Sequence, residues 1–453
     1  MKPAVYQYLD SFINYELYLN NVSAEKFNLE RIRHLLKLAG DPQEKLKIIH
    51  IAGSKGKGST AAFIAEGLKA CGYKTGLYTS PHLLDLKERF RILDAERPGP
   101  GEIYPDTIAD EELSGIVGDL KPYLETARDD ARYGALTYFE VLTTAAFAFF
   151  EREKVDFAVM ETGLGGRLDA TNVAGALVSV ITPIGLEHTK QLGSTIAEIA
   201  AEKAAVIKEG GRAVSGIQSL EAADVIRKRC ARVHASLKCV GKDMIIEHCR
   251  MTETGMSVDL KGKEAYSLIS RSFGRHQAEN MAAAFLVMEE LREQGFAINT
   301  EKFIRGIAAA VVPGRFEIVR QSPALILDAA HTRESVEALV NTLRQMYQDK
   351  KAYVIAGCSN DKDYAAILGL LSGIAKEIVF TTYDHPRSAD IPEDQLQTAA
   401  PDVPVGKAGS FVESLDKILA KAEENDIILV TGSIFLIAEA KKRLTKKMIG
   451  GVE

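Results

Sequence analysis

The stretch from Lys47 to Thr60 reads KIIHIAGSKGKGST: a short apolar run is followed by glycines around a lysine and then by two hydroxyl side chains. Ile48, Ile49 and Ile51 are typical of a buried parallel strand, and residues 61–70 are rich in helix-forming residues. Glycines let backbone N–H groups turn inward around an anion, and the N-terminus of a helix also favours phosphate. The segment therefore predicts a strand, a phosphate-binding loop and a helix in succession.

The spacing between the glycines of this loop differs from that of a common phosphate loop. A common phosphate loop has four residues between its first glycine and the Gly-Lys pair, whereas here Gly53 lies only three positions before Gly56. Lys57 is expected to contact the β- and γ-phosphates of a nucleotide, and a hydroxyl that follows it is expected to reach Mg²⁺. The strand and helix on either side disfavour the alternative of a glycine-rich turn with an exposed lysine. The predicted nucleotide-binding residues of the loop are Gly53, Ser54, Lys55, Gly56, Lys57, Gly58, Ser59 and Thr60.

Length and composition restrict the class of protein. A chain of 453 residues exceeds what one hydrophobic core usually supports, so two domains are expected. A net charge of −6 argues against nucleic acid as the main partner. No apolar run is long enough to span a membrane, and the first residues lack the apolar core of a signal peptide. The five cysteines are an odd number without CxxC spacing, which predicts free thiols in a reducing compartment and a cytoplasmic protein.

Strand and helix signals alternate along the chain, which favours an α/β fold with a parallel, doubly wound sheet. The predicted strands of the first half are 48–52, 76–79, 157–160 and 177–184, and the predicted helices are 61–70, 138–150 and 195–208. Shorter alternating strands are expected between about 213 and 268, followed by a helix over 277–291. A second series then begins, with strands at 325–327, 352–356, 377–381 and 427–431, a helix at 333–346 and a C-terminal helix.

The second series contains no Gly-Lys-Ser/Thr phosphate loop. We therefore predict a phosphate-loop ATPase-like domain over residues 1–311 and a Rossmann-like α/β domain without its own nucleotide loop over residues 312–453.

Several further motifs occur together with the loop and in a specific order. In chain order they are GSKGKGST at 53–60, SPHL at 80–83, TYFE at 137–140, ETGLGGRLDATN at 161–172, IGLEHT at 184–189, EK at 202–203, PGRF at 313–316 and DAAH at 328–331. This ordered set, which spans nearly the whole chain, resembles the folylpolyglutamate synthase and dihydrofolate synthase family. That family belongs to the group that includes the bacterial Mur ligases, which use ATP to join an amino acid to a carboxylate.

The resemblance implies an ATP-dependent ligase that holds two Mg²⁺ ions. Ser80, Glu161 and His188 match family positions that hold these ions, and Ser59 of the loop is expected to join them. Lys203 matches a lysine that is carbamoylated in the family, a change that turns an ammonium into a carboxylate-like group. The alternative interpretations are a hydrogen-bonded core histidine at 188 and an unmodified helix-surface cation at 203. Lys57, Lys203, His188 and Arg315 are the expected catalytic residues.

The resemblance also implies how the three substrates are bound. Asn280, Arg315, Asp328 and His331 are expected to contact ATP; Lys362 and Arg387 are candidates for L-glutamate; and Arg89 and Glu140 are candidates for the pterin side. A structural salt bridge is the alternative for Arg315, whose guanidinium could otherwise neutralise charge in the transition state. A monomer without nucleic-acid or membrane partners is expected.

Two segments differ from those of many bacterial members, which read Thr-Asn where this chain has Ser54-Lys55, and His-Asn-Pro where it has His331, Thr332 and Arg333. In both segments the residues of this chain resemble those of eukaryotic folylpolyglutamate synthases, which extend preformed folates. Glutamate addition to a folate is therefore favoured, and addition to dihydropteroate stays open. The alternatives are a Mur-type amide ligase for another carboxylate and a nucleotide-binding regulator without catalysis.

Overall fold

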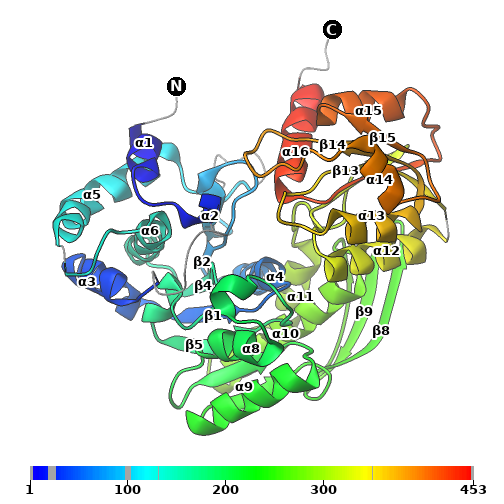
Figure 1. Cartoon of the computed structure of the whole chain (residues 1–453). Helices are drawn as coiled ribbons and strands as arrows, with labels where there is room; N and C mark the ends of the chain where they lie inside the picture. Colours follow the sequence, from blue (N-terminus) through cyan, green and yellow to red (C-terminus); the bar gives the residue numbers. More distant parts are fainter. Residues whose placement is uncertain (1–3, 19–26, 97–103, 131, 349, 450–453) are drawn as a thin grey trace. The chain divides into compact units, whose positions relative to one another are not determined.

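The computed structural model describes residues 4–18, 27–96, 104–130, 132–348 and 350–449 (Figure 1). The chain divides into two compact units. The first comprises residues 1–248, 258–268 and 278–310, and the second comprises residues 249–257, 269–277 and 311–453.

The first unit is built on a seven-stranded sheet in the order β3-β2-β4-β1-β5-β6-β7. All neighbours in this sheet are parallel except the β2–β3 pair. Its strands are β1 (Ile48–Ala52), β2 (Thr75–Tyr78), β3 (Phe90–Leu93), β4 (Phe157–Glu161), β5 (Ala176–Ile181), β6 (Arg212–Ser215) and β7 (Ser236–Cys239). Since β1 lies in the middle, its carboxyl end is where open α/β sheets bind ligands.

Helices surround this sheet. They are α1 (Ala4–Asp10), α2 (Tyr15–Tyr18), α3 (Glu30–Leu38), α4 (Lys57–Ala70), α5 (Asp110–Asp129), α6 (Tyr138–Arg152), α7 (Thr189–Leu192), α8 (Ile196–Ala204), α9 (Leu220–Arg232), α10 (Arg275–Glu293) and α11 (Thr300–Ala309). Figure 1 shows α1, α3, α5 and α6 grouped at one end of the unit, where their apolar faces share one core with β2 and β4. Every residue of β1, β2 and β4 is buried, as is typical of strands covered on both faces.

Residues 213–268 depart from the expected run of strands. Strands β8 (Ile245–Thr252), β9 (Gly255–Lys261) and β10 (Ala265–Ser270) form the expected small sheet, with exposed and buried residues alternating along β10. Residues 220–232, however, form helix α9, so the strand prediction was wrong there. Ser219 caps this helix by accepting from the Ala222 N–H, and its buried residues Ala222, Ile226 and Cys230 recur every four positions, which is a helical spacing.

The second unit contains a six-stranded sheet in the order β11-β12-β16-β13-β14-β15, parallel except for the β11–β12 pair. Its strands are β11 (Glu317–Gln321), β12 (Ala324–Asp328), β13 (Ala352–Ala356), β14 (Ala375–Thr381), β15 (Val405–Ala408) and β16 (Ile427–Thr431). Its helices are α12 (Arg333–Tyr347), α13 (Tyr364–Ser372), α14 (Glu393–Ala399), α15 (Phe411–Leu419) and α16 (Ile434–Ile449). The two α/β series confirm the predicted fold class.

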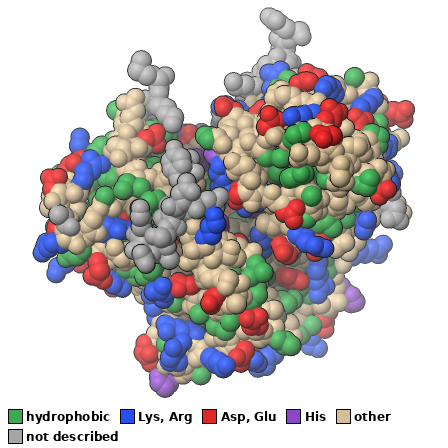
Figure 2. Space-filling view, in the orientation of Figure 1, with side chains coloured by type: hydrophobic (Ala, Val, Ile, Leu, Met, Phe, Trp, Pro, Cys, Tyr) green, Lys and Arg blue, Asp and Glu red, His purple; other side chains and the backbone are tan. Residues whose placement is uncertain are grey.

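Basic and acidic side chains are interspersed over the face of the molecule drawn in Figure 2. Among the described side chains on that face, no large patch of a single charge indicates a binding site. The candidates for a site are therefore the strand ends and the residues predicted from the motifs.

Candidate active site

The predicted phosphate loop lies between β1 and α4, as the sequence indicates. Gly56 has a φ of 83° and precedes the first residue of α4, and a Cβ there would collide with the Asn280 side chain. A Cβ at Gly53, whose φ is 151°, would collide with Thr182. Only glycine fits both positions, because neighbouring side chains occupy the space and φ is positive. The loop therefore forms a tight turn that delivers the N-terminus of α4 to the carboxyl end of β1.

Part of the loop's backbone is held by the protein itself. The N–H groups of Ser54 and Lys55 both donate to the Pro183 carbonyl, at 3.0 and 3.1 Å, and Ser54 Oγ donates to the Gly185 carbonyl at 3.1 Å. These two amides therefore support the loop in this structure. The N–H groups at the start of α4, which lack intrahelical partners, are the ones placed to receive an anion.

Three lysines gather at the loop. Lys57 Nζ and Lys203 Nζ donate to the same acceptor, the Gly53 carbonyl, at 3.2 and 2.8 Å. Lys203 also donates to Glu187 at 3.0 Å, and Lys55 Nζ lies 3.9 Å from the other oxygen of that carboxylate. The Lys203 side chain is only 1% exposed, so the alternative of a helix-surface cation is wrong.

Burial and charge shift the pKa values of this cluster. Burial, which disfavours the ammonium, and the nearby Lys57 lower the pKa of Lys203 to about 8, although Glu187 acts in the opposite direction. Burial also opposes ionisation of Glu187, but the surrounding cations prevail and lower its pKa to about 2. The carboxylate is thus ionised at neutral pH, while part of the Lys203 population is a neutral amine.

A buried carboxylate at the end of β4 also lies against the start of α4. Glu161 ends β4, is 4% exposed, and accepts a hydrogen bond from the Ser80 N–H at 3.2 Å. A Cβ added to Gly58 would lie 3.5 Å from Glu161 Oε2, which places the carboxylate against the first turn of α4. Thr60 Oγ1 and Thr162 Oγ1 are buried without a hydrogen-bond partner in the described structure. The motifs at 53–60, 80–83 and 161–172 thus converge in space.

His188 is exposed at the start of α7, in a left-handed conformation with a φ of 49°. The alternative of a core histidine is therefore wrong. Within the described ranges, no group of three or more His, Cys, Asp and Glu side chains is arranged to hold a metal ion. The expected Mg²⁺ set includes only two such residues, Glu161 and His188, and otherwise consists of Ser59, Ser80 and Lys203.

The predicted contacts to ATP fall in both units. Asn280 is buried in α10 of the first unit, against Gly56. In the second unit, Asp328 ends β12 and accepts from the backbone N–H groups of Phe316 and Ala330 at 2.7 and 2.8 Å. Burial raises the pKa of Asp328, while Arg315 opposes the rise, so the guanidinium lies within electrostatic range of this carboxylate. His331 Nδ1 lies 2.8 Å from a backbone carbonyl two residues earlier.

The two candidates for L-glutamate are brought together in the second unit. Lys362 and Arg387 both contact Asp361, at 3.0 and 2.9 Å. Burial opposes ionisation of Asp361, but the two cations prevail and lower its pKa to about 2. The result is a partly exposed group of two cations around one carboxylate.

The two candidates for the pterin side lie in ion pairs, of which the Glu140–Arg31 pair is buried and the Arg89–Glu16 pair is half-buried. Arg89 donates to both oxygens of Glu16, at 2.7 and 2.6 Å, and to His82 Nδ1 at 3.0 Å. Glu140 accepts from Arg31 Nε at 3.0 Å and forms a capping box at the start of α6. Their polar atoms thus hold the core of this end of the first unit together, and their contact with a substrate stays a prediction.

Several residues of the site received no role from the sequence. Glu187 pairs with Lys203, Pro183 accepts from the loop, and Thr182 packs against Gly53. All three lie in the segment that follows β5, within or directly before the IGLEHT motif. The only sequence signal for these three residues was therefore their position, directly after a strand that pairs with β1.

The chain matches two family descriptions: the Mur ligase middle domain over residues 113–288 and the Mur ligase glutamate ligase domain over residues 314–434. It is 36% identical over 427 residues to the dihydrofolate synthase/folylpolyglutamate synthase of Bacillus subtilis, covering 92% of this chain and 95% of that protein. The chain belongs to the folylpolyglutamate synthase and dihydrofolate synthase family. The folylpolyglutamate synthase of Lacticaseibacillus casei is 30% identical, over 91% of this chain and 94% of that one.

Solved structures agree with this assignment. The Mycobacterium tuberculosis folylpolyglutamate synthase complexed with ADP superposes with a TM-score of 0.85, at 30% identity and 97% coverage of both chains. An FPGS complex with AMPPCP and folate gives a TM-score of 0.82 at 28% identity, covering 97% of this chain and 98% of that one. This member of the family is thus an ATP-dependent ligase, as predicted. Within the described ranges, every helix is too short or too polar to cross a membrane.

Proposed function

We propose that this protein uses ATP to join the amino group of L-glutamate to a carboxylate of a folate. The observation that carries the proposal is the convergence at the carboxyl end of β1, where Lys57 and Lys203 share the Gly53 carbonyl and Glu161 lies against the first turn of α4. This arrangement suits the phosphates of a nucleotide. The ADP, AMPPCP and folate complexes of related enzymes support it.

The chemistry explains why such a site is needed. A carboxylate is a poor electrophile, so an amide does not form from it at neutral pH without activation. Transfer of the γ-phosphoryl group to the carboxylate oxygen gives an acyl phosphate and ADP. The glutamate nitrogen then attacks the acyl carbon, the C–O bond to phosphate breaks, and the amine loses its proton. Phosphoryl transfer depends mainly on positioning and on charge neutralisation.

The chain's own residues have distinct roles in this proposal. Lys57 and the N-terminus of α4 hold the β- and γ-phosphates, Asn280 contacts the adenine, and Arg315 with Asp328 and His331 of the second unit engages the nucleotide. Lys362 and Arg387 bind a carboxylate of L-glutamate as paired cations. Arg89 and Glu140 act on the pterin side through the ion pairs that shape it.

The residues around Glu161 fit Mg²⁺. This ion prefers oxygen ligands. The buried Glu161 carboxylate lies against the first turn of α4, and Thr60 of the same helix has a buried hydroxyl without a partner in the described structure. Mg²⁺ bound there supplies positive charge to the phosphates. We propose that Ser59, Ser80, Glu161 and His188 hold two such ions, with Lys203 joining them after carbamoylation, because its ammonium form would repel a cation.

The remaining features of the proposal concern the whole protein. We propose that the protein acts as a monomer. Five free thiols favour a reducing compartment, and we propose the cytoplasm. Residues 1–311 would carry the phosphate loop and the pterin side, and residues 312–453 the glutamate ligase part.

An ADP-release assay tests the function. The purified protein is incubated with ATP, Mg²⁺, L-glutamate and, in turn, dihydropteroate, tetrahydrofolate or methylenetetrahydrofolate, and the product is identified by mass spectrometry. We expect ADP release that requires both the pteridine and glutamate, with one glutamyl residue added. Turnover with a different carboxylate alone would instead indicate another Mur-type ligase, and nucleotide binding without any turnover would indicate a regulator.

A further inference from the structure

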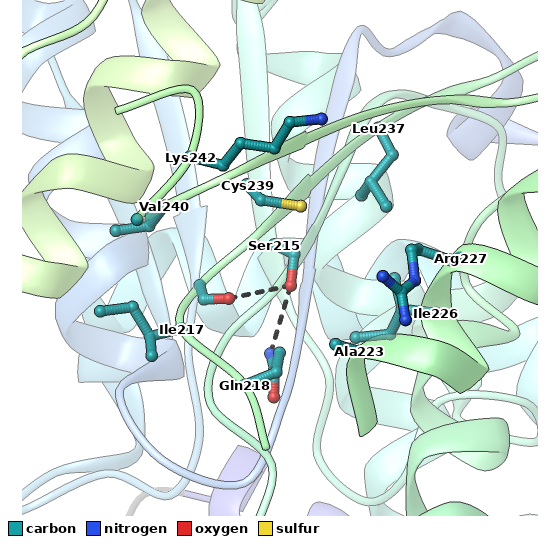
Figure 3. A pocket seen from close by; sticks show the side chains of 12 residues that line it. Ser215, Ile217, Gln218, Ala223, Ile226, Arg227, Leu237, Cys239, Val240 and Lys242 are labelled. Carbon is teal, nitrogen blue, oxygen red and sulfur yellow. Dashed lines mark hydrogen bonds between the residues drawn. The ribbon is translucent and has the colours of Figure 1, made fainter. Parts of the chain in front are cut away.

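A cavity of about 390 Å³ lies beyond the carboxyl end of β6 in the first unit. Figure 3 shows the side chains that line it, among them Ser215, Gln218 and Cys239. The Gln218 amide points toward Ser215, and its Nε2 lies 3.4 Å from Ser215 Oγ. Gln218 is half-buried and lies three residues after the end of β6.

The Gln218 side chain binds the backbone of the strand next to β6. Its Nε2 donates to the carbonyls of Ile181 and Thr182, at 3.3 and 3.1 Å, and its Oε1 accepts from the Ile184 N–H at 3.0 Å. Both ends of one amide therefore hold the three residues at which β5 ends and the loop after it begins. The Gly216 N–H adds a bond to the same Ile181 carbonyl at 2.8 Å.

The segment that Gln218 holds is the one that supports the phosphate loop. The Thr182 N–H donates to the Ala52 carbonyl at 2.8 Å, directly before the loop. Pro183, which lies between the residues bound by Gln218, accepts the N–H groups of both Ser54 and Lys55. Gln218 therefore binds the residues on both sides of Pro183, and the Pro183 carbonyl in turn binds the loop.

We propose that Gln218 is a positioning residue for nucleotide binding: its side-chain amide fixes the Pro183 carbonyl, and that carbonyl fixes the phosphate loop. The inference rests on the proposed function, because it takes the loop as the ATP site. It adds a residue that lies outside every motif of the family resemblance. An amide suits this position because it donates and accepts at once, whereas a carboxylate cannot donate to the two carbonyls.

The test compares Gln218 with a matched glutamine in the second unit. Gln397 Nε2 donates to the carbonyls of Ala400 and Val403, at 3.1 and 3.0 Å, and its Oε1 accepts from the Val405 N–H at 3.1 Å. It is half-buried like Gln218, but its hydrogen bonds support the turn before β15 in the second unit. Each of the full-length variants Gln218→Met and Gln397→Met removes two bonds donated to carbonyls and one bond accepted from an N–H, at nearly constant side-chain length. Gln218→Met also removes the 3.4 Å bond to Ser215 Oγ.

Two readouts are measured: the Kd for AMPPCP with Mg²⁺ by calorimetry, and hydrogen exchange at the Ser54 and Lys55 amides. For Gln218→Met we expect a Kd raised about 10-fold, as is common when a supporting residue behind a binding site is removed, together with faster exchange at both amides. Gln397→Met should lose similar thermal stability but change the Kd by less than about twofold, because the hydrogen bonds it removes share no partner with the residues that hold the phosphate loop.

The outcomes are distinguishable. Equal Kd values for wild type and Gln218→Met, or equal weakening by the two Met variants, would overturn the inference while leaving the proposed function intact. A wild-type protein that binds no AMPPCP would contradict the proposed function itself. If Gln218→Met does not fold, Gln218→Glu serves instead, because it keeps the acceptor for the Ile184 N–H while losing both donors, and the same increase in Kd is expected.

Discussion

Two ammonium groups share one backbone carbonyl at the phosphate loop. Lys57 and Lys203 both donate to Gly53, and the carboxylate nearest to them, that of Glu187, pairs with Lys203. Such a concentration of positive charge next to a helix N-terminus attracts a polyphosphate and neutralises charge that develops on it. The individual lysines can therefore be tested one at a time.

Lys57→Ala should abolish turnover without unfolding the protein. Lys57 is half-buried and its hydrogen bond to a carbonyl contributes about 1 kcal/mol to stability, whereas loss of one transition-state donor lowers kcat about 100-fold or more. Steady-state kinetics and urea unfolding measure the two effects. Lys69→Ala is the control, because Lys69 lies on the same helix and pairs with Glu66 in the part of the chain that the structure describes, and it should keep full activity. A kcat for Lys57→Ala above about a tenth of wild type would contradict the assignment of the loop.

Lys203→Ala should also be inactive, and formate or acetate should partly restore activity. The prediction follows from carbamoylation: a small carboxylate can occupy the space that the missing carbamate leaves. A pKa near 8 leaves part of the amine neutral, which is the form that reacts with CO₂. The measurement is turnover with and without the acids, together with ¹³C NMR of wild type under ¹³CO₂.

Lys208 is a suitable control for Lys203, because burial likewise lowers its pKa to about 8 while it bonds Asn172 instead of the loop. Lys208→Ala should show no rescue by carboxylic acids. Active wild-type enzyme with an unmodified Lys203 would refute the carbamoylation.

The buried His50 predicts a pH dependence of stability. Its Nε2 lies 2.7 Å from Thr171 Oγ1, and burial, with Lys208 nearby, lowers its pKa from 6.5 to about 3. Below pH 6.5 His50 is protonated in the unfolded chain but stays neutral in the folded chain. The free energy of unfolding therefore decreases as the pH falls from 6.5 toward 3. We expect His50→Asn to remove about 2 kcal/mol of the wild-type decrease in unfolding free energy between pH 7 and pH 5.

Urea unfolding at the two pH values measures this decrease. The exposed His234, whose φ of 49° also suits asparagine, provides the control, and His234→Asn should leave the pH dependence unchanged. An equal decrease in unfolding free energy for wild type and His50→Asn between the two pH values would show that His50 does not contribute to the pH dependence of stability.

At the scale of elements, the helix that follows the phosphate loop is held by a second helix at very short range. A Cβ at Gly306 of α11 would collide with the Glu66 carbonyl of α4, and a Cβ at Gly67 of α4 would collide with the Phe303 ring of α11. Backbone atoms cannot move aside as a flexible side chain can. Glycine at these positions therefore sets the distance between the two helices and the packing of α4.

Gly306→Ala should lower the unfolding free energy by about 1–3 kcal/mol, because the added methyl group overpacks the contact between α4 and α11. A Cβ at Gly118 in α5 would lie in open space. Gly118→Ala should therefore raise the unfolding free energy by up to about 1 kcal/mol, because alanine has the higher helix propensity. Urea unfolding of both variants checks the contrast. An equal effect of the two substitutions would show that helix propensity, and not packing, governs both positions.

At the scale of the whole molecule, the open question is which carboxylate the enzyme activates. Dihydropteroate carries it on the benzoate ring, and a folate carries it one glutamate side chain further out. A rigid pterin pocket can present both to the same γ-phosphate only if the substrate shifts. The chain is similar over 92% of its length to the dihydrofolate synthase/folylpolyglutamate synthase of Bacillus subtilis. The resemblance of Ser54-Lys55 and His331-Thr332 to eukaryotic folylpolyglutamate synthases favours a folate as the substrate.

We predict that a reduced folate monoglutamate is a better substrate than dihydropteroate, by about tenfold in kcat/KM. The measurement is kcat/KM for both substrates under the same conditions. The double variant Ser54→Thr/Lys55→Asn, which restores the common bacterial pair, should move the ratio toward dihydropteroate. An equal or higher kcat/KM for dihydropteroate in the wild type would show that these positions do not indicate the substrate.

The sequence by itself determined the features that depend on neighbouring residues. The buried strand at 48–52, the glycine turn and helix α4 follow from contiguous residues, and strands at 352–356 and 427–431 lie where the apolar runs place them. The ordered motifs were sufficient for the family and the ligase class. Local spacing decides such features, because strand, turn and helix are formed by residues close together in the chain.

Only the tertiary structure decided which side chains meet. Lys203 reaches the Gly53 carbonyl from 150 residues away, Arg31 pairs with Glu140 across 109 positions, and Gln218 supports a loop that begins far upstream. No periodicity predicts such contacts, because they depend on how the strands are ordered in the sheet. The same order places the segment after β5 beside the loop after β1, which gives Glu187 a partner and leaves Lys203 buried.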